Sequence, residues 1–362
     1  MIVNKQHYRT IWPMPSAGSG RAQVAILDQT QLPHEFAIVH IANLAQMEVA
    51  IKTMQVRGAP LIGAAAAYGL ALAAQEDASK EALQAAAQRL RLSRPTAVNL
   101  DWALKRMLSM LLLVPQADRA SLAWSEAQAI CDEDVLQNQA IGQHGLALMQ
   151  QCQPKSAQVF NVLTHCNAGW LATVDVGTAL APIYAAHDAG MAVHVWVDET
   201  RPRNQGASLT AWELAQHGVP HTVISDNAGG HLMQQGLVDM VLVGADRVSG
   251  QGDVCNKIGT YLKALAAFDN GLPFYAAVPS PTIDWSVSDA LSEIEIEQRH
   301  GDEVAFIQGL ATNGSLQSVR LVPSGSSTAN PAFDVTPARL VTGIITERGV
   351  FSPARLLDAK RA

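Results

Sequence analysis

The fold of this chain is decided by the stretch Val159–Gly169, VFNVLTHCNAG, in which an apolar run ends abruptly in polar residues. Four more apolar runs of strand length follow, at Val193–Val197, Thr222–Ile224, Met240–Val243 and Phe274–Val278. Strands without polar alternation, separated by helices, predict a parallel sheet covered on both faces in a doubly wound arrangement. Those helices are expected at about Val174–Ala189, Ser208–Gln216, His231–Gln235 and Lys257–Asp269.

The first part of the chain has a different pattern. Two short strands are expected at Val24–Leu27 and Glu35–His40. From Leu44 to Met149 apolar residues recur at helical spacing with few Gly or Pro residues. This region therefore predicts helices that pack beside a small β element.

The two patterns predict an α/β protein with two domains. A length of 362 residues allows one large domain or two ordinary ones. We expect a mainly helical N-terminal domain with short strands over residues 1–150, and a Rossmann-like catalytic domain over residues 151–362. The boundary is placed in Gln150–Ser156, where QQCQPKS breaks the helical pattern.

Composition narrows the partners of this chain. Hydrophobic residues make up 48% and charged residues 16%, a globular balance that excludes a disordered chain. The formal charge of −7 offers no basic field, so we expect no nucleic acid, and a few local Arg and Lys residues must hold any anionic substrate. The richest apolar stretch, Ala59–Ala74, is shorter than a membrane span and predicts a buried helix, so we expect no membrane partner.

The cysteine and histidine patterns predict the redox state of the compartment and whether the chain has a metal site. The four cysteines are too few and too scattered for a disulfide framework, so free thiols in a reducing cytoplasm are expected. No C-x-x-C pair and no H-E-x-x-H motif occurs, and no metal site is predicted. The N-terminus has no apolar run of the kind found in signal peptides.

Two residues that follow predicted strands are candidates for catalysis. Ligands of open α/β sheets bind beyond the carboxyl ends of the strands, near the point where strand order reverses. Cys166 lies there in THCNAG, where it is either a small buried hydrophobe or a thiol beside backbone N–H groups. Asp246 ends VLVGAD, where it is either a helix cap or partner of Arg247, or an acid in a partly desolvated cleft.

Phosphate binding needs cations and backbone N–H donors. Arg57, Gly58 and Ala59 open the apolar helix, which joins a guanidinium to a helix N-terminus; the alternative is a surface arginine on a capped buried helix. Arg94 is a second candidate before a predicted helix. Lys257 is a third, and its alternative is a solvated charge on a helix.

Several motifs with other functions are missing. No G-x-S-x-G elbow is present, which disfavours hydrolysis by a nucleophilic serine. No P-loop occurs, and no G-x-G-x-x-G follows a predicted strand, so dinucleotide binding has little support.

A series of motifs in this chain resembles the 5-methylthioribose-1-phosphate isomerase family of methionine salvage, in the family's order and over almost the whole length. The motifs are RGAPLIG (Arg57–Gly63), SRPTAVNL (Ser93–Leu100), THCNAG (Thr164–Gly169), DETRPRNQGASLTAWEL (Asp198–Leu214), SDNAGGHLM (Ser225–Met233), GADRV (Gly244–Val248), NKIGTY (Asn256–Tyr261) and NPAFDVTPARLVTGIITERGVF (Asn330–Phe351).

The resemblance implies an activity and a set of site residues. It implies an aldose–ketose isomerisation of methylthioribose 1-phosphate to methylthioribulose 1-phosphate, by a homodimer that needs no metal or organic cofactor. Asp246 matches the family's proton-transferring acid, and Cys166 matches its active-site thiol. The positions that match the family's substrate contacts are Arg57, Gly58, Ala59, Arg94, Gln205, Asn256 and Lys257.

Other functions stay open at this point. A related isomerase would act on ribose 1,5-bisphosphate or 5-deoxyribose 1-phosphate. A non-catalytic chain would resemble the regulatory subunits of translation initiation factor 2B, and a nucleotide-dependent dehydrogenase is a third alternative. The sequence does not decide between a proton shuttle and a hydride shift, nor the role of Cys166.

Overall fold

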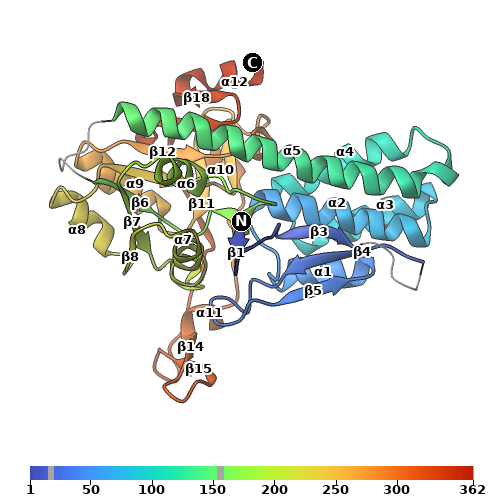
Figure 1. Cartoon of the computed structure of the whole chain (residues 1–362), viewed down its shortest axis with the longest axis horizontal. Helices are drawn as coiled ribbons and strands as arrows, with labels where there is room; N and C mark the ends of the chain where they lie inside the picture. Colours follow the sequence, from blue (N-terminus) through green and yellow to red (C-terminus); the bar gives the residue numbers. More distant parts are fainter. Residues whose placement is uncertain (15–19, 153–158, 362) are drawn as a thin grey trace.

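The computed structural model describes residues 1–14, 20–152 and 159–361. The α/β part of the chain lies at one end of the molecule and the helical part at the other, and one long helix runs along both (Figure 1). Most of the predicted boundary segment, residues 153–156, falls outside the described residues.

A seven-stranded sheet forms the centre of the α/β part, and all of its strand pairs are parallel except the one that joins β18 to β17. Counted in chain order, its parallel strands lie side by side in the order 3-2-1-4-5-6, the arrangement of doubly wound dinucleotide-binding sheets. Strand order therefore reverses between β6 and β9. The strands across the sheet are β18 (Gly349–Phe351), β17 (Gly343–Thr346), β12 (Phe274–Ala277), β9 (Met240–Val243), β6 (Phe160–Thr164), β7 (Val193–Asp198) and β8 (His221–Ile224).

Both faces of this sheet are buried, which explains its continuous apolar runs. Along β9, Met240 and Leu242 belong to one hydrophobic core, and Val241 and Val243 belong to another. Residues of α5 (Gln116–Gln151) and α6 (Leu180–Asp188) complete the first core, and those of α8 (Ala228–Gln234), α9 (Thr260–Asp269) and α12 (Leu356–Arg361) complete the second. The predicted α/β class with a doubly wound parallel sheet is confirmed.

Two of the expected helices begin later than predicted. The helix expected from Val174 begins at Leu180, because the residues before it form turns that hold the loop after β6. The helix expected from Lys257 begins at Thr260, and Lys257 itself ends strand β11 (Val254–Lys257). The helix expected from Ser208 is a π-helical turn, Gly206–Thr210, that continues into α7 (Ala211–His217).

A second, smaller sheet lies beyond the end of β9 and was not predicted. Strands β10 and β11 form an antiparallel hairpin, and β11 also pairs with β16. This hairpin explains why Lys257 does not lie on a helix. The strands run in the order β13 (Ile283–Asp284), β10 (Arg247–Ser249), β11 and β16 (Phe333–Thr336). Between β13 and β16 the chain forms α10 (Ala290–Glu293), α11 (Asp302–Ala305) and the protruding hairpin of β14 (Phe306–Leu310) and β15 (Leu316–Arg320) (Figure 1).

The helical part packs four helices beside a small antiparallel sheet, as the sequence predicts apart from one extra strand. The sheet has the order β3 (Ile11–Met14), β4 (Gln23–Leu27), β5 (Ile38–Ile41), of which β3 was not foreseen. Two further short strands, β1 (Ile2–Val3) and β2 (Gln6–His7), pair with each other. The helices are α1 (Leu44–Lys52), α2 (Ala59–Glu76), α3 (Lys80–Ser93) and α4 (Val98–Leu111). Helix α2 is the central one, because its residues from Leu61 to Ala74 are all buried and its many alanines let neighbours approach closely.

Helix α5 (Gln116–Gln151) contributes to the cores of both parts. Its Ala127 and Ile130 pack in the core around α2, whereas Ile141 and Met149 pack against the large sheet. The division into domains at residue 150 stays a prediction. Among the described residues, no helix is both long enough and apolar enough to cross a membrane.

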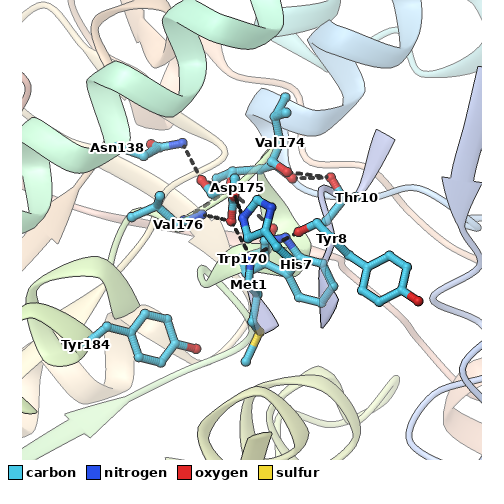
Figure 2. A network of polar contacts seen from close by, with 12 residues as sticks. Met1, His7, Tyr8, Thr10, Asn138, Trp170, Val174, Asp175, Val176 and Tyr184 are labelled. Atoms are coloured by element: carbon cyan, nitrogen blue, oxygen red, sulfur yellow. Dashed lines mark hydrogen bonds and ion pairs between the residues drawn. The ribbon is translucent and has the colours of Figure 1, made fainter. Parts of the chain in front are cut away.

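A polar network ties α5 to the N-terminal strands and to the loop after β6 (Figure 2). Thr10 donates its backbone N–H to Val174 O at 3.0 Å, and Val174 donates its own to Asp134 Oδ2 at 2.8 Å. His7 Nε2 lies 2.7 Å from Asp175 Oδ2, and Asn138 Nδ2 donates to Asp175 O at 3.3 Å. The loop after β6 is therefore bonded both to the N-terminal strands and to α5.

Candidate active site

Cys166 and Asp246 come together where the strand order reverses. Cys166 follows β6, Asp246 follows β9, and these two strands are neighbours in the sheet. Both residues line one small cavity of about 30 Å³, together with Arg57, Gly58 and Asn256. That volume holds about one water molecule.

Cys166 is fixed by its backbone. It has a φ of +64°, unusual for a residue other than glycine, and its side chain is buried. Its N–H donates to Thr200 Oγ1 at 2.8 Å, and its carbonyl accepts from Thr210 Oγ1 at 2.7 Å. Its sulfur lies 3.9 Å from Arg57 Nη2. A small hydrophobe needs neither the strained backbone nor the guanidinium beside the thiol.

Asp246 is neither a helix cap nor the partner of Arg247. It precedes strand β10, and the Arg247 guanidinium lies 3.6 Å from Asp284 and donates to Thr96 O. Burial raises the pKa of Asp246, and the positive charges of Lys257, Arg94 and Arg57 offset part of that rise. Its carboxyl has no side-chain hydrogen bond to any described residue, so it is left for a ligand.

Arg57 is buried, which excludes a surface arginine. Its Nη1 donates to Asn167 Oδ1 at 2.7 Å and its Nη2 to Asn167 O at 2.9 Å. Gly58, with φ of +92°, begins helix α2, and a Cβ there would lie 2.3 Å from Ala172 O. Only glycine therefore lets the helix start against the loop after β6.

Arg94 directly follows α3 and lines a further small cavity together with Asp246. Its Nε and Nη1 are buried without a hydrogen-bond partner among the described residues, and its nearest carboxylate, that of Glu297, is 3.6 Å away. Burial lowers the pKa of Arg94, and the charge of Glu297 offsets part of that effect. Donors left unpaired in a buried position are costly unless a ligand accepts from them.

Lys257 is 7% exposed, which excludes a solvated helix charge. Its Nζ donates to Ala332 O at 3.0 Å and lies 4.6 Å from the Phe333 ring. Burial lowers the pKa of Lys257, while the nearby charges of Cys166 and Asp246 act to raise it. The adjacent Asn256 is buried and donates from Nδ2 to Thr260 Oγ1 at 3.0 Å.

Gln205 lies in an adjoining cavity rather than beside Cys166. Its side chain is buried and its Oε1 has no partner among the described residues. With Arg57 it lines a cavity of about 310 Å³ between the turn at residues 29–34 and strand β14. Arg57 also lines the small cavity, so the two cavities adjoin at this residue. Seven of the nine predicted residues line one of these two cavities. Arg94 lines a further small cavity with Asp246, and Lys257 lies close enough to Asp246 and Cys166 for their charges to affect its pKa.

Sequence reasoning missed a buried carboxylate behind the site. Glu213 of α7 is completely buried and accepts four hydrogen bonds, two at each oxygen. Oε1 accepts from Asn167 Nδ2 at 2.8 Å and Leu171 N at 2.9 Å. In the sequence, an acidic residue in TAWELAQH is typical of a solvated helix face, so no local signal marks it.

A second missed cluster lies under the neighbouring loop. His165 Nδ1 is 2.9 Å from Asp198 Oδ2, and its Nε2 is 2.8 Å from Ile258 O, one residue after Lys257. Asp226 completes a set of three side chains of a kind that ligate metals. The Lys263 ammonium lies 3.1 Å from Asp198 and also bonds to the Asp226 carbonyl, so a protein cation already supplies positive charge there.

Comparison with known proteins places this chain in a family. The model described as the Initiation factor 2 subunit family matches residues 55–353. Fold and site thus define the class as a doubly wound α/β protein of that family, with a small cavity lined by Arg57, Cys166 and Asp246 where strand order reverses.

The more similar relatives share one name. The methylthioribose-1-phosphate isomerase of Rhodospirillum rubrum is 62% identical over 97% of this chain and 90% of its own length. That of Gluconobacter oxydans is 60% identical over 96% of this chain and 95% of its own length. Within the initiation factor 2 subunit family, the chain belongs to the methylthioribose-1-phosphate isomerases.

Solved structures show the same fold on two kinds of protein. The 5-methylthioribose 1-phosphate isomerase of Pyrococcus horikoshii has a TM-score of 0.81 and 40% identity, covering 98% of this chain and 96% of that one. A structure described as translation initiation factor eIF-2B subunit delta, from A. fulgidus, has a TM-score of 0.79 and 38% identity, covering 98% and 99%. Fold alone therefore does not separate enzyme from regulatory subunit.

Proposed function

We propose that this chain isomerises 5-methylthioribose 1-phosphate to 5-methylthioribulose 1-phosphate in methionine salvage. The observation that carries the proposal is the position of Asp246. Its carboxyl is partly buried, has no hydrogen bond from the described part of the chain, and faces the same cavity as Cys166. A non-catalytic subunit gains nothing from an acid held in that way, whereas an isomerase needs one.

The chemistry of the substrate explains why the acid must keep its proton. Phosphate on the anomeric oxygen prevents ordinary ring opening, so the enzyme must assist cleavage of the bond between C1 and the ring oxygen. A protonated Asp246 supplies a proton to that leaving oxygen. Burial raises its pKa, which favours the protonated form that the step requires. Hydrogen then moves from C2 to C1, the C2 hydroxyl gives its proton to the Asp246 carboxylate, and the ketose results.

Cations around Asp246 support the binding of a phosphate. Arg94 has two unpaired buried donor atoms, and Lys257 and Arg57 are also close enough to influence the pKa of Asp246. An arginine with free donors grips phosphate in a bidentate manner, and the N-terminus of α2 at Ala59 adds backbone donors. Because the small cavity holds about one water, we expect a bound sugar phosphate to extend toward the larger cavity beyond Arg57.

Cys166 acts with Asp246 on the opposite side of the reacting carbons in this proposal. In a proton shuttle its thiol exchanges a proton with C1 or C2, and in a hydride shift it stabilises charge. Transfer in deuterated water separates the two, because a shuttle incorporates solvent deuterium into the product and a hydride shift does not.

Turnover by the purified chain tests the proposed function. We expect conversion of methylthioribose 1-phosphate, followed by phosphorus and proton NMR, with lower kcat/KM for ribose 1,5-bisphosphate and 5-deoxyribose 1-phosphate. Preference for the bisphosphate would assign the related isomerase instead. No turnover of any of the three sugars by the folded chain would favour a regulatory subunit.

We also propose that the chain is a cytoplasmic homodimer. The four cysteines are free, which suits a reducing compartment. Large apolar side chains are exposed on α9, where Leu262 is 58% and Phe268 is 64% exposed, and these support an interface between copies. Light scattering on the eluting protein is expected to give twice the chain mass, and a monomer would contradict the proposal.

A further inference from the structure

Glu213 is a buried carboxyl surrounded by hydrogen-bond donors. Its Oε2 accepts from Trp170 N at 2.7 Å and from Tyr184 Oη at 2.8 Å, in addition to the two bonds at Oε1. Burial raises the pKa of Glu213, and these four donors offset part of that rise. A Cβ on Gly169 would lie 2.1 Å from Oε2, so the turn needs glycine to let the carboxylate approach. Four donors and no acceptor around one carboxyl favour its charged form.

The path from Glu213 to the site passes through one amide. Asn167 donates from Nδ2 to Glu213, and its Oδ1 and its backbone carbonyl both accept from Arg57. The amide therefore has a fixed direction, with its donor toward the buried anion and its acceptor toward the guanidinium. All three side chains are buried, so water does not screen this arrangement.

We propose that Glu213 is a positioning residue for the isomerisation: through the Asn167 amide, it fixes where the Arg57 guanidinium lies. The inference rests on the proposed function. Glu213 touches neither cavity, whereas Arg57 lines both and lies 3.9 Å from the Cys166 sulfur. The buried anion is thus balanced by an active-site cation two side chains away. The π-helical turn before α7 brings Thr210 to the same amide, 3.2 Å from Nδ2, as a secondary contact.

A swap of amide and carboxylate tests this path. Asn167→Asp keeps the acceptor for Arg57 but sets two carboxyls 2.8 Å apart, in the place of the present hydrogen bond. We expect kcat/KM to fall by about tenfold or more, and to fall further as pH rises, because the two carboxyls must then share a proton. Asn167→Asp combined with Glu213→Gln places a donor opposite the new carboxyl. We expect this double variant to recover at least about fivefold of the loss.

The double variant keeps any charge that Asn167→Asp adds to the cavity, so recovery must come through the contact between the two residues. A double variant no more active than Asn167→Asp alone would overturn the proposal. Tyr184→Phe is the matched control, because it removes one bond to the other oxygen and leaves the path to Arg57 intact. It is expected to lower thermal stability while kcat/KM stays within about twofold of the parent chain.

A second readout does not depend on the substrate. Displacement of the Arg57 guanidinium is expected to slow alkylation of Cys166 by iodoacetamide in Asn167→Asp, with recovery in the double variant, measured by mass spectrometry of the peptide. If the parent chain fails to convert the sugar phosphate, the proposed function fails, and alkylation still tests the positioning path.

If Asn167→Asp does not fold, Glu213→Gln and Tyr184→Phe are compared. Equal activity in those two variants would also overturn the proposal.

Discussion

Two acids near Arg57, the buried Glu213 and the partly buried Asp246, have opposite hydrogen-bond environments. On what we call the anchor side, Glu213 accepts hydrogen bonds from Asn167, Trp170, Leu171 and Tyr184. On the reactive side, which consists of Asp246, Arg94 and Lys257, the carboxyl accepts no hydrogen bond from a described side chain and Arg94 keeps two unpaired donor atoms.

The difference separates groups that hold the structure from groups kept for a ligand. A carboxylate with every lone pair occupied contributes to stability and has no capacity left for chemistry. Groups that are buried but unpaired lower the stability of the fold, and they occur where hydrogen bonds to a bound substrate offset that loss. Changes on the reactive side should therefore lower activity more than stability. Changes on the anchor side should lower stability and, through Arg57, activity as well.

The largest expected effect comes from Asp246→Asn on the reactive side. This change removes the proton donor but keeps the shape of the side chain, so kcat should fall by roughly 10²–10⁴-fold. Thermal unfolding should change little, because no hydrogen bond is lost. Steady-state kinetics and calorimetry on the same preparation measure both quantities. Near-normal kcat would show that Asp246 is not the acid.

Removal of the Arg94 guanidinium should weaken binding rather than folding. We expect Arg94→Met to raise KM for the sugar phosphate by about 10–100-fold, since charged hydrogen bonds to phosphate are lost. The melting temperature should stay the same or rise, because a poorly paired buried cation is removed. Stabilisation of the parent chain by inorganic phosphate, seen as a thermal shift, should disappear in the variant. A melting temperature lowered as much as in Glu213→Gln would break the distinction between the two sides.

Loss of the anchor should lower stability as well as kcat/KM. Glu213→Gln places an amide N–H group among four donors, and we expect the free energy of unfolding to fall by about 2–4 kcal/mol. Tyr184→Phe removes a single bond and should cost about 1 kcal/mol. Urea unfolding of the two variants and the parent gives these differences. An equally small loss of unfolding free energy in Glu213→Gln and Tyr184→Phe would show that the full set of hydrogen bonds is not what stabilises the anchor side.

Another buried acid, Asp134 on α5, is expected to affect stability alone, and its effect depends on pH. Burial raises the pKa of Asp134 to about 7, well above its unfolded value of about 4. Folding is therefore penalised increasingly as pH rises from about 4 to about 7. Asp134→Asn can still accept at the position that bonds Val174 N and Asn138 Nδ2. The variant should be more stable than the parent at pH 8, by on the order of 2 kcal/mol, and should lose that advantage toward pH 4.

Melting temperatures of parent and Asp134→Asn across this pH range test the sign. A difference that stays constant from pH 5 to pH 8 would contradict a titrating Asp134.

Most of the large sheet could be predicted from the sequence because its strands are buried on both faces. Continuous apolar runs such as Met240–Val243 carry that information locally. The rule that ligands bind where strand order reverses then directed attention to Cys166 and Asp246, although the order itself was not predicted. Motif resemblance supplied residues such as Gln205, for which spacing gave no signal.

The features that were missed depend on contacts between distant parts of the chain. Strand β11 contains Cys255, Asn256 and Lys257, and only its pairing with β10 and β16 reveals it as a strand. Glu213 resembles a surface residue until Trp170 and Asn167 from another loop are placed against it. Periodicity reports which face of an element is buried, but not which polar residue is buried with its partners.

The shared helix α5 limits how this enzyme can admit its substrate. Its backbone hydrogen bonds continue from one core into the other, with no break between Ile130 and Ile141. A hinge between the two cores would have to break them, which is costly in a helix interior. We therefore expect entry to the small cavity through movement of the shorter segments that line the adjoining larger cavity, such as the turn at residues 29–34 and the base of the β14–β15 hairpin. The rate of product release should respond to changes in those segments, while the long helix serves as the rigid frame against which they move.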